Sequence, residues 1–104
     1  MSKYPLYPVM PHELRQMFNE GRYYERVKAG EFTQKVLKNR HPALPVANEP
    51  VCTRSQIIAY HDNSGNRIAL VHQYLRRDGS LGASGQPDPK RLLSNGILYV
   101  VLEP

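Results

Sequence analysis

The sequence predicts an α+β domain in which short N-terminal helices pack on one face of a small antiparallel sheet of about four strands. Apolar residues recur at helical spacing in residues 11–40, and β-branched and aromatic runs fill residues 55–104. The proline-rich segment "HPALPVANEP" separates these two halves. A chain of 104 residues is too short for two ordinary domains, so we expect residues 1–104 to form a single one.

Residues 1–10 are predicted to form an extended arm. Tyr4 and Tyr7 each precede a proline, and a residue before proline favours extended geometry over helix. Because Leu6 and Val9 make the arm partly apolar, we expect it to lie across the body of the domain or across a second subunit.

Residues 11–40 are predicted to be helical. Pro11 suits a first helical position, and Leu14, Met17 and Phe18 form one apolar stripe that Gly21 ends. Further helical stretches are expected over 22–29 and 31–39, the latter because Phe32 and Val36 are four residues apart. A glycine inside a helix costs about 1 kcal/mol, which favours three short helices over one long helix.

Residues 41–54 are predicted to cross irregularly to the sheet of residues 55–104. Two hairpins are expected there, one around "DNSGN" at 62–66 and one at Asn95–Gly96, where a type I′ turn needs positive φ at both residues. Asp78–Gly79 predicts a further tight turn that brings "SLGA" back against "QYLR".

The first hairpin decides which residues share a sheet face with His72. A five-residue loop over 62–66 places His61 opposite Arg67 and His61 and His72 on different faces, whereas a four-residue loop places them on the same face. We favour the five-residue loop because it gathers the more apolar face. That register groups His72 with residues Ile58, Tyr60, Ile68, Leu70 and Tyr74.

Composition limits the class of function. The net charge is +5 and the pI is about 9.6, which favours acidic partners such as nucleic acid, although many basic proteins bind none. Cys52 is the one cysteine, so neither an intramolecular disulfide nor a cysteine-based zinc site can form. A single cysteine fits a reducing cytoplasm, and the sequence shows neither a signal peptide nor a run of about 20 apolar residues. Since no metal-ligand cluster with useful spacing appears either, we expect a cytoplasmic protein without membrane, metal or cofactor partners.

The loop "LGASGQPDPKR" at 81–91 invites a phosphate-binding interpretation, but its spacing does not match a nucleotide fold. Gly85 and Lys90 are five residues apart, and the two prolines between them remove amide donors, so GxxxxGK[ST] is absent. Two interpretations remain. The segment is either a stiffened surface loop, or a small anion nest of amides at 82–85 with charge added by Lys90 and Arg91.

Basic residues gather in three places along the chain. They are the group Lys35, Lys38 and Arg40, the pair Arg76 and Arg77, and the pair Lys90 and Arg91. With Tyr60, Tyr74 and Tyr99 on the strands, such residues can hold single-stranded nucleic acid by phosphate contact and stacking. The predicted nucleic-acid or anion-binding residues are Arg76, Arg77, Lys90 and Arg91. The alternative is that the cations are solvated residues at the ends of helices and strands, and that the tyrosines lie at the edge of the hydrophobic core.

Cleavage of RNA would need a general base and a general acid, and His72 is the candidate for one of these roles. The alternative for His72 is a half-buried structural histidine whose hydrogen bonds are satisfied. If the protein is a ribonuclease, the candidate catalytic residues are His72, Tyr74, Arg76 and Lys90. The order of helices followed by an antiparallel sheet with basic, histidine and tyrosine residues is similar in outline to small bacterial ribonuclease toxins of the RelE and barnase-like groups. That similarity is one of layout, carried by no motif of residues, and fold alone does not give function.

Three functional hypotheses follow. The first is a small basic non-enzymatic interaction module, which can form a homodimer, because no catalytic constellation stands out and an antiparallel sheet leaves edges to protect. The alternative is a nucleic-acid-binding module that uses a basic and aromatic sheet surface. The second alternative is a small ribonuclease of toxin type.

Overall fold

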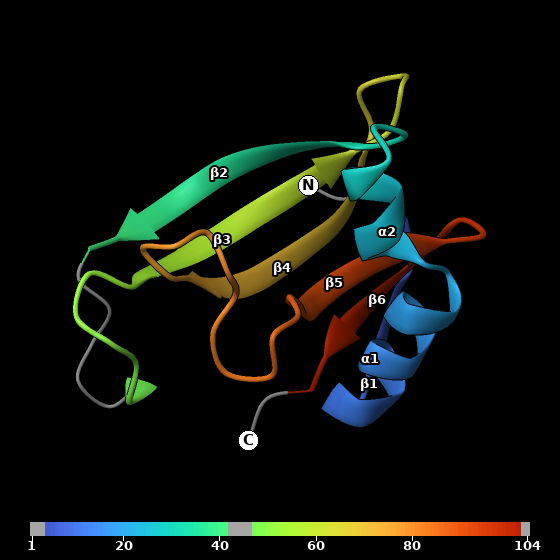
Figure 1. Ribbon diagram of the computed structural model, residues 1–104. Coiled ribbons are helices and arrows are strands. Elements are labelled where there is room, and N and C mark those ends of the chain that lie inside the picture. Colours follow the sequence, from blue (N-terminus) through green and yellow to red (C-terminus); the bar gives the residue numbers. More distant parts are fainter. Residues whose placement is uncertain (1–3, 42–46, 103–104) are drawn as a thin grey trace.

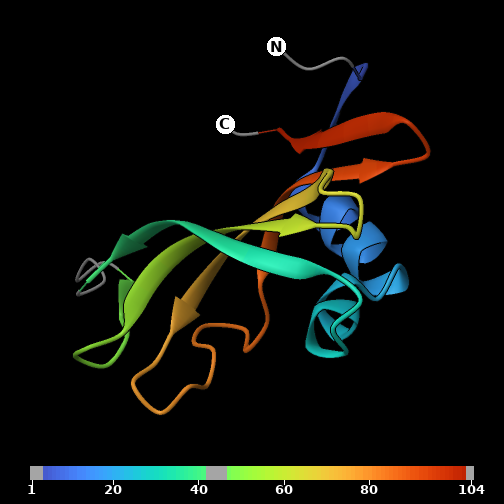
Figure 2. The ribbon, with the colours of Figure 1, turned by 90° about the horizontal axis from the view of Figure 1, so that it is seen from above.

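The computed structural model describes residues 4–41 and 47–102, and these form one six-stranded sheet with two helices gathered on one side of it (Figure 1, Figure 2). The elements in chain order are β1 (Leu6–Val9), α1 (Pro11–Glu20), α2 (Tyr23–Lys28), β2 (Thr33–Arg40), β3 (Arg54–His61), β4 (Arg67–Leu75), β5 (Asp88–Ser94) and β6 (Ile97–Val101). The strands lie side by side in the order β1-β6-β5-β4-β3-β2. The α+β class is confirmed, with six strands in place of about four.

The predicted N-terminal arm supplies an edge strand. β1 pairs with β6 in parallel, with Leu6 opposite Leu98 and Val9 opposite Val101, so the sheet is mixed rather than purely antiparallel. The amide of Leu98 donates to the Pro5 carbonyl at 2.9 Å. The extended arm therefore lies along the body of its own chain, and residues 1–3 lie outside the described residues.

Helix α1 begins at Pro11 and covers the sheet with its apolar stripe. The Glu13 carboxylate accepts a 2.9 Å hydrogen bond from the Met10 amide, which satisfies a donor just ahead of the helix. Leu14 and Phe18 are 0% and 2% exposed. They pack in the core with side chains of the strands, among them Ile58, Tyr60, Ala69, Val71 and Leu92. The helix is held to β5 and β6 by this burial.

The predicted helix over 31–39 is wrong, because residues Thr33–Arg40 form β2. β2 pairs antiparallel with β3, from Thr33 opposite His61 to Arg40 opposite Ser55. The spacing between Phe32 and Val36 suits a helix, but four is also an even number, so both side chains fit one face of a strand as well. A nine-residue helix is marginal by itself, and pairing with β3 satisfies the same backbone groups.

Both predicted hairpins are present. The turn after β3 is held by Asp62, whose carboxylate accepts hydrogen bonds of 2.9 Å from the amides of Ser64 and Asn66. Asn95 and Gly96 have φ of 51° and 77°, the two positive values that a type I′ turn requires. The turn at 78–79 also brings the chain back, with a bridge between Leu75 and Leu81. Of the predicted crossing segment 41–54, residues 42–46 lie outside the described residues.

A β-bulge at Ile68 changes which residues share a face with His72. His61 does lie opposite Arg67, as the five-residue loop predicts, but Tyr60 lies opposite Ala69, so Ile68 is an extra residue in β4. Beyond the bulge, His72 faces Ile57 rather than the predicted face of Ile58 and Tyr60.

The bulge also returns the two histidines to a common face. His61 lies four residues after Ile57 in β3, so the two side chains are on the same face of the sheet. Because Ile57 is the partner of His72, the predicted separation of His61 and His72 onto opposite faces is wrong. The two side chains still do not form a pair, because four residues of β3 span about 13 Å.

The sheet therefore has two distinct faces. The helical face carries Ile58, Ala69, Val71 and Leu92, which pack in the core with α1. The other face, which we call the open face, carries residues that alternate with them, namely Ser55, Ile57, Leu70, His72, Tyr74 and Arg91. Neither of the two helices that the structure describes is long and apolar enough to cross a membrane.

Candidate functional site

An open pocket of about 710 Å³ lies where the end of β4 meets the start of β5 and the loop that joins them. Its lining comes from α1, β3, β4, residues 82–87 of the loop and the first residues of β5. His72 and Tyr74 line it from β4, Lys90 from β5 and Arg15 from α1. Imidazole, phenol, ammonium and guanidinium groups thus border one concave surface, which is the arrangement expected of a site for an anionic ligand.

His72 is held in place by two neighbours. Its Nε2 atom lies 2.8 Å from Ser55 Oγ, within a hydrogen bond whose direction depends on the tautomer. Its ring meets the Tyr74 ring edge to face, with centroids 4.7 Å apart. Partial burial lowers the pKa of His72 below 6.5, the nearby Lys90 ammonium lowers the pKa further, and Asp88 opposes both. Burial and the Lys90 charge therefore both favour the neutral form of the His72 imidazole.

One carboxylate partly balances the two cations of the pocket. Asp88 Oδ2 lies 3.1 Å from Lys90 Nζ, and Asp88 Oδ1 lies 3.8 Å from Arg15 Nη1. Exposed pairs of this kind contribute about 0–1 kcal/mol each, so they do not commit either cation to Asp88. The pocket keeps a net positive charge that a phosphate could meet without breaking a strong internal bond.

The loop at 81–91 holds an anion, but that anion is part of the protein. Glu49 Oε2 accepts a 2.7 Å hydrogen bond from the Ala83 amide, and Oε1 accepts a 2.9 Å bond from Arg76 Nε. The Gly82 and Gly85 amides donate to the Tyr74 and Gly82 carbonyls. Three amides of the expected nest are thus already used, and these contacts with Arg76 and Ala83 lower the pKa of Glu49.

The structure separates the four predicted anion-binding residues. Lys90 lines the His72 pocket. Arg76 is bound to Glu49, and together with Arg77 it lines a smaller pocket of about 330 Å³. Arg91 lines a third pocket, on the open face, together with Arg67. Of the residues predicted for a ribonuclease, His72, Tyr74 and Lys90 come together, and Arg76 points instead to Glu49.

Basic residues of β2 join the open face, and the sequence hypothesis did not include them in the site. By register, Lys35 lies opposite Ala59, Lys38 opposite Ile57, and Arg40 opposite Ser55, which places all three on the face of His72. All three are exposed. Among the described residues, none of them forms an ion pair with a carboxylate. The sequence signal for these three cations was the run "KVLKNR". Because we expected a helix there, the run did not indicate a basic sheet surface.

Arg15 was also missed, because it lies 57 positions from His72 along the chain and only the packing of α1 brings it near. The strand tyrosines divide differently from the expectation. Tyr60 is fully buried in the core and Tyr99 packs against it, so Tyr74 is the strand tyrosine that borders the pocket.

No group of three or more His, Cys, Asp or Glu side chains that could hold a metal ion occurs within residues 4–41 and 47–102. No family model matches the chain, and no match was found among curated proteins or among solved structures. The functional argument therefore depends on the pocket and on the open face.

Proposed function

We propose that the protein is a non-enzymatic binding module for single-stranded nucleic acid, which it holds across the open face of β2, β3 and β4. The observation that supports this most directly is the position of Lys35, Lys38 and Arg40. They lie on the face of His72 and Tyr74, without an ion pair among the described residues. Cations that are not neutralised internally are available to phosphate oxygens.

The spacing of the strands suits this ligand. Neighbouring strands lie about 4.8 Å apart, so β2 and β4 are separated by about 10 Å. A strand of nucleic acid that crosses the sheet can contact the β2 cations with its phosphates and reach Tyr74 with an unstacked base. Lys90 and Arg15 then meet the next phosphate in the pocket. Because a base can stack on Tyr74 only when it is unpaired, the arrangement favours single strands over duplex.

The proposal is tested by fluorescence anisotropy with a labelled single-stranded oligonucleotide over a range of salt concentrations. The affinity is expected to fall steeply with salt, and the double variant Lys35→Gln/Lys38→Gln should reduce the slope of log K against log salt by about 1.4, because each phosphate contact contributes about 0.7. The double variant Arg22→Gln/Lys28→Gln removes the same charge beside α2 and is the matched control. No binding at low salt, or equal losses in both variants, would contradict the proposal.

RNA cleavage is the second candidate, and the placement of His72 beside the two cations Lys90 and Arg15 in one pocket is the observation that favours it. In this reaction His72 accepts the proton of a 2′-hydroxyl, whose oxygen attacks phosphorus. The bond to the 5′-oxygen breaks, and Lys90 gives that oxygen a proton while Arg15 stabilises the phosphorane charge.

A cleavage assay separates the two candidates. A catalytic role predicts products with 2′,3′-cyclic phosphate ends, resistance of a 2′-deoxy substrate, and loss of cleavage but not of binding in His72→Ala. A wild-type chain that binds RNA and leaves it intact supports the binding module alone.

A further inference from the structure

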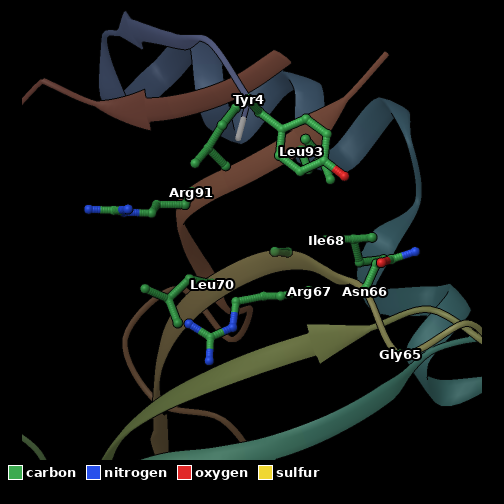
Figure 3. A pocket seen from close by; sticks show the side chains of 10 residues that line it. Tyr4, Gly65, Asn66, Arg67, Ile68, Leu70, Arg91 and Leu93 are labelled. Atoms are coloured by element: carbon green, nitrogen blue, oxygen red, sulfur yellow. The ribbon is translucent and has the colours of Figure 1, made fainter. Parts of the chain in front are cut away.

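The pocket that Arg67 and Arg91 line, of about 580 Å³, lies on the open face near the start of β4 (Figure 3). Most of its large apolar lining residues are aliphatic, the Tyr4 ring lies beside Leu93, and two arginines also line it. The lining residues that matter here are Ile68, Leu70, Leu93, Leu98, Arg67 and Arg91. We call this surface the leucine groove.

No helix or strand within residues 4–41 and 47–102 covers the leucine groove. α1 packs against β5 and β6 from the opposite side through Leu14 and Phe18. On the open side, Leu93 lies opposite Leu98, and Leu98 lies opposite Leu6, which is 58% exposed. An apolar sheet face is normally buried under a second layer of secondary structure. The groove therefore has the character of an interface rather than of an ordinary solvated surface.

The two arginines at the rim of the groove favour an acidic ligand. Leu70 lies opposite Arg91 in the sheet, and Figure 3 shows Leu70 between the side chains of Arg91 and Arg67. Neither arginine forms an ion pair among the described residues. Guanidinium groups bind carboxylates in a bidentate manner, and such pairs are strongest when an apolar contact beside them excludes water.

We propose that the leucine groove docks an acidic amphipathic helix of a partner protein. The apolar stripe of the helix covers Leu70, Leu93 and Leu98, and its carboxylates meet Arg67 and Arg91. A helix there would give the sheet a second helical layer opposite α1. The site is separate from the nucleic-acid proposal, and neither depends on the other.

The charge of the chain and the side chains that line the groove argue against a second copy of the chain and against a nucleic acid as the ligand. A second copy of the chain, which carries a net charge of +5, would bring the same arginines together across a two-fold axis. A nucleic acid stacks its bases on aromatic rings, and the lining offers one such ring, that of Tyr4, against the four large aliphatic side chains of Ile68, Leu70, Leu93 and Leu98, which suit an apolar helix face better.

The test is a selection from a phage-displayed library of helical 16-residue peptides against the full chain. Enriched peptides are expected to combine leucine-type residues at helical spacing with Asp or Glu beside them. A synthetic enriched peptide should bind Arg67→Ala/Arg91→Ala at least tenfold more weakly than the wild type. It should bind Arg22→Ala/Lys28→Ala, which removes the same charge beside α2, within about twofold of the wild type. Circular dichroism confirms that both variants fold.

Several results would overturn the proposal. They are a selection without enrichment, enriched peptides that lack acidic residues, and peptide affinity that the arginine pair does not change. Wild-type chain that dimerises through the groove, with the arginine variant monomeric by light scattering, would assign the surface to a second copy. Arg67→Ala/Arg91→Ala binding an oligonucleotide as weakly as Lys35→Gln/Lys38→Gln, with no peptide binding, would assign the surface to nucleic acid.

Discussion

The Ala83 amide donates a 2.7 Å hydrogen bond to the carboxylate of Glu49, a residue 34 positions earlier in the chain. The same carboxylate accepts a hydrogen bond from Arg76, and the Glu49 side chain is 5% exposed. Glu49 therefore joins three segments, namely the connection before β3, the end of β4 and the loop that borders the His72 pocket. The shape of that pocket depends on a residue that does not line it.

Glu49→Gln should lower the free energy of unfolding at pH 7 and weaken binding in the pocket. Because the pKa of Glu49 is lower in the folded chain than its usual value of 4.5, this stability is present above pH 4.5 and is lost as the pH falls below it. The difference between wild type and variant should therefore narrow in acid. Urea denaturation at pH 7 and at about pH 3 measures it, with the exposed Glu25→Gln as control. A difference that persists unchanged in acid would count against this role.

Gly82→Ala should destabilise the chain by about 1–3 kcal/mol, because a Cβ at Gly82 would collide with the Glu49 carboxylate. Glu49→Ala removes the colliding atoms, so the double variant should be more stable than the sum of the two single changes predicts. Thermal denaturation of the wild type, the two single variants and the double variant completes this double-mutant cycle. Strictly additive losses of stability would show that the chain relieves the collision without moving the Glu49 carboxylate.

Tyr60→Phe should raise the free energy of unfolding by about 1 kcal/mol. The Tyr60 side chain is fully buried, and its hydroxyl has no hydrogen-bond partner among the described residues. Removal of a buried unsatisfied hydroxyl ends a desolvation cost while the ring still fills the core. Chemical denaturation measures the change, and the half-buried Tyr99→Phe is the comparison. A loss of stability in Tyr60→Phe would mean that the hydroxyl is satisfied in solution.

His72 should titrate below pH 6.5, and its two charged neighbours should move that midpoint in opposite directions. Lys90→Met removes a cation that disfavours the imidazolium, so the pKa of His72 should rise, whereas Asp88→Asn should lower it. A bound oligonucleotide should also raise the pKa of His72, because phosphate stabilises the imidazolium. NMR titration of the imidazole signals follows all four cases, and an unchanged midpoint in Lys90→Met would place Lys90 away from His72.

Much of the fold follows from local sequence signals. Asn95–Gly96 specified its turn because few other pairs accept positive φ at both positions, and Pro11 marked the start of α1 correctly. β2 was not predictable in the same way. Phe32 and Val36 satisfy helical and strand periods alike, and the deciding contacts of β2 come from β3, whose paired residues are 15 to 28 positions away.

The candidate site was only partly predictable, and the reason is again non-local. Sequence reasoning chose His72, Tyr74 and Lys90, which do meet in one pocket. It also chose Arg76, whose partner Glu49 is 27 positions away and does not belong to any local pattern. Face assignments failed beyond Ile68, because a single extra residue inverts the alternation of every side chain after it.

The bulge of β2 has a consequence for how this surface can change. Val36 pairs with Ile58 and Lys38 with Ile57, so Leu37 is the extra residue that brings Lys38 and Arg40 to the same side of the sheet as Lys35. If β2 kept Leu37 but paired with β3 without this bulge, Lys38 and Arg40 would turn toward the helices although the composition of the chain stayed the same. Deletion of Leu37 would instead leave Lys35, Lys38 and Arg40 in regular alternation on the open face. The electrostatic character of the open face is therefore encoded in the bulge of β2 as much as in its charged residues.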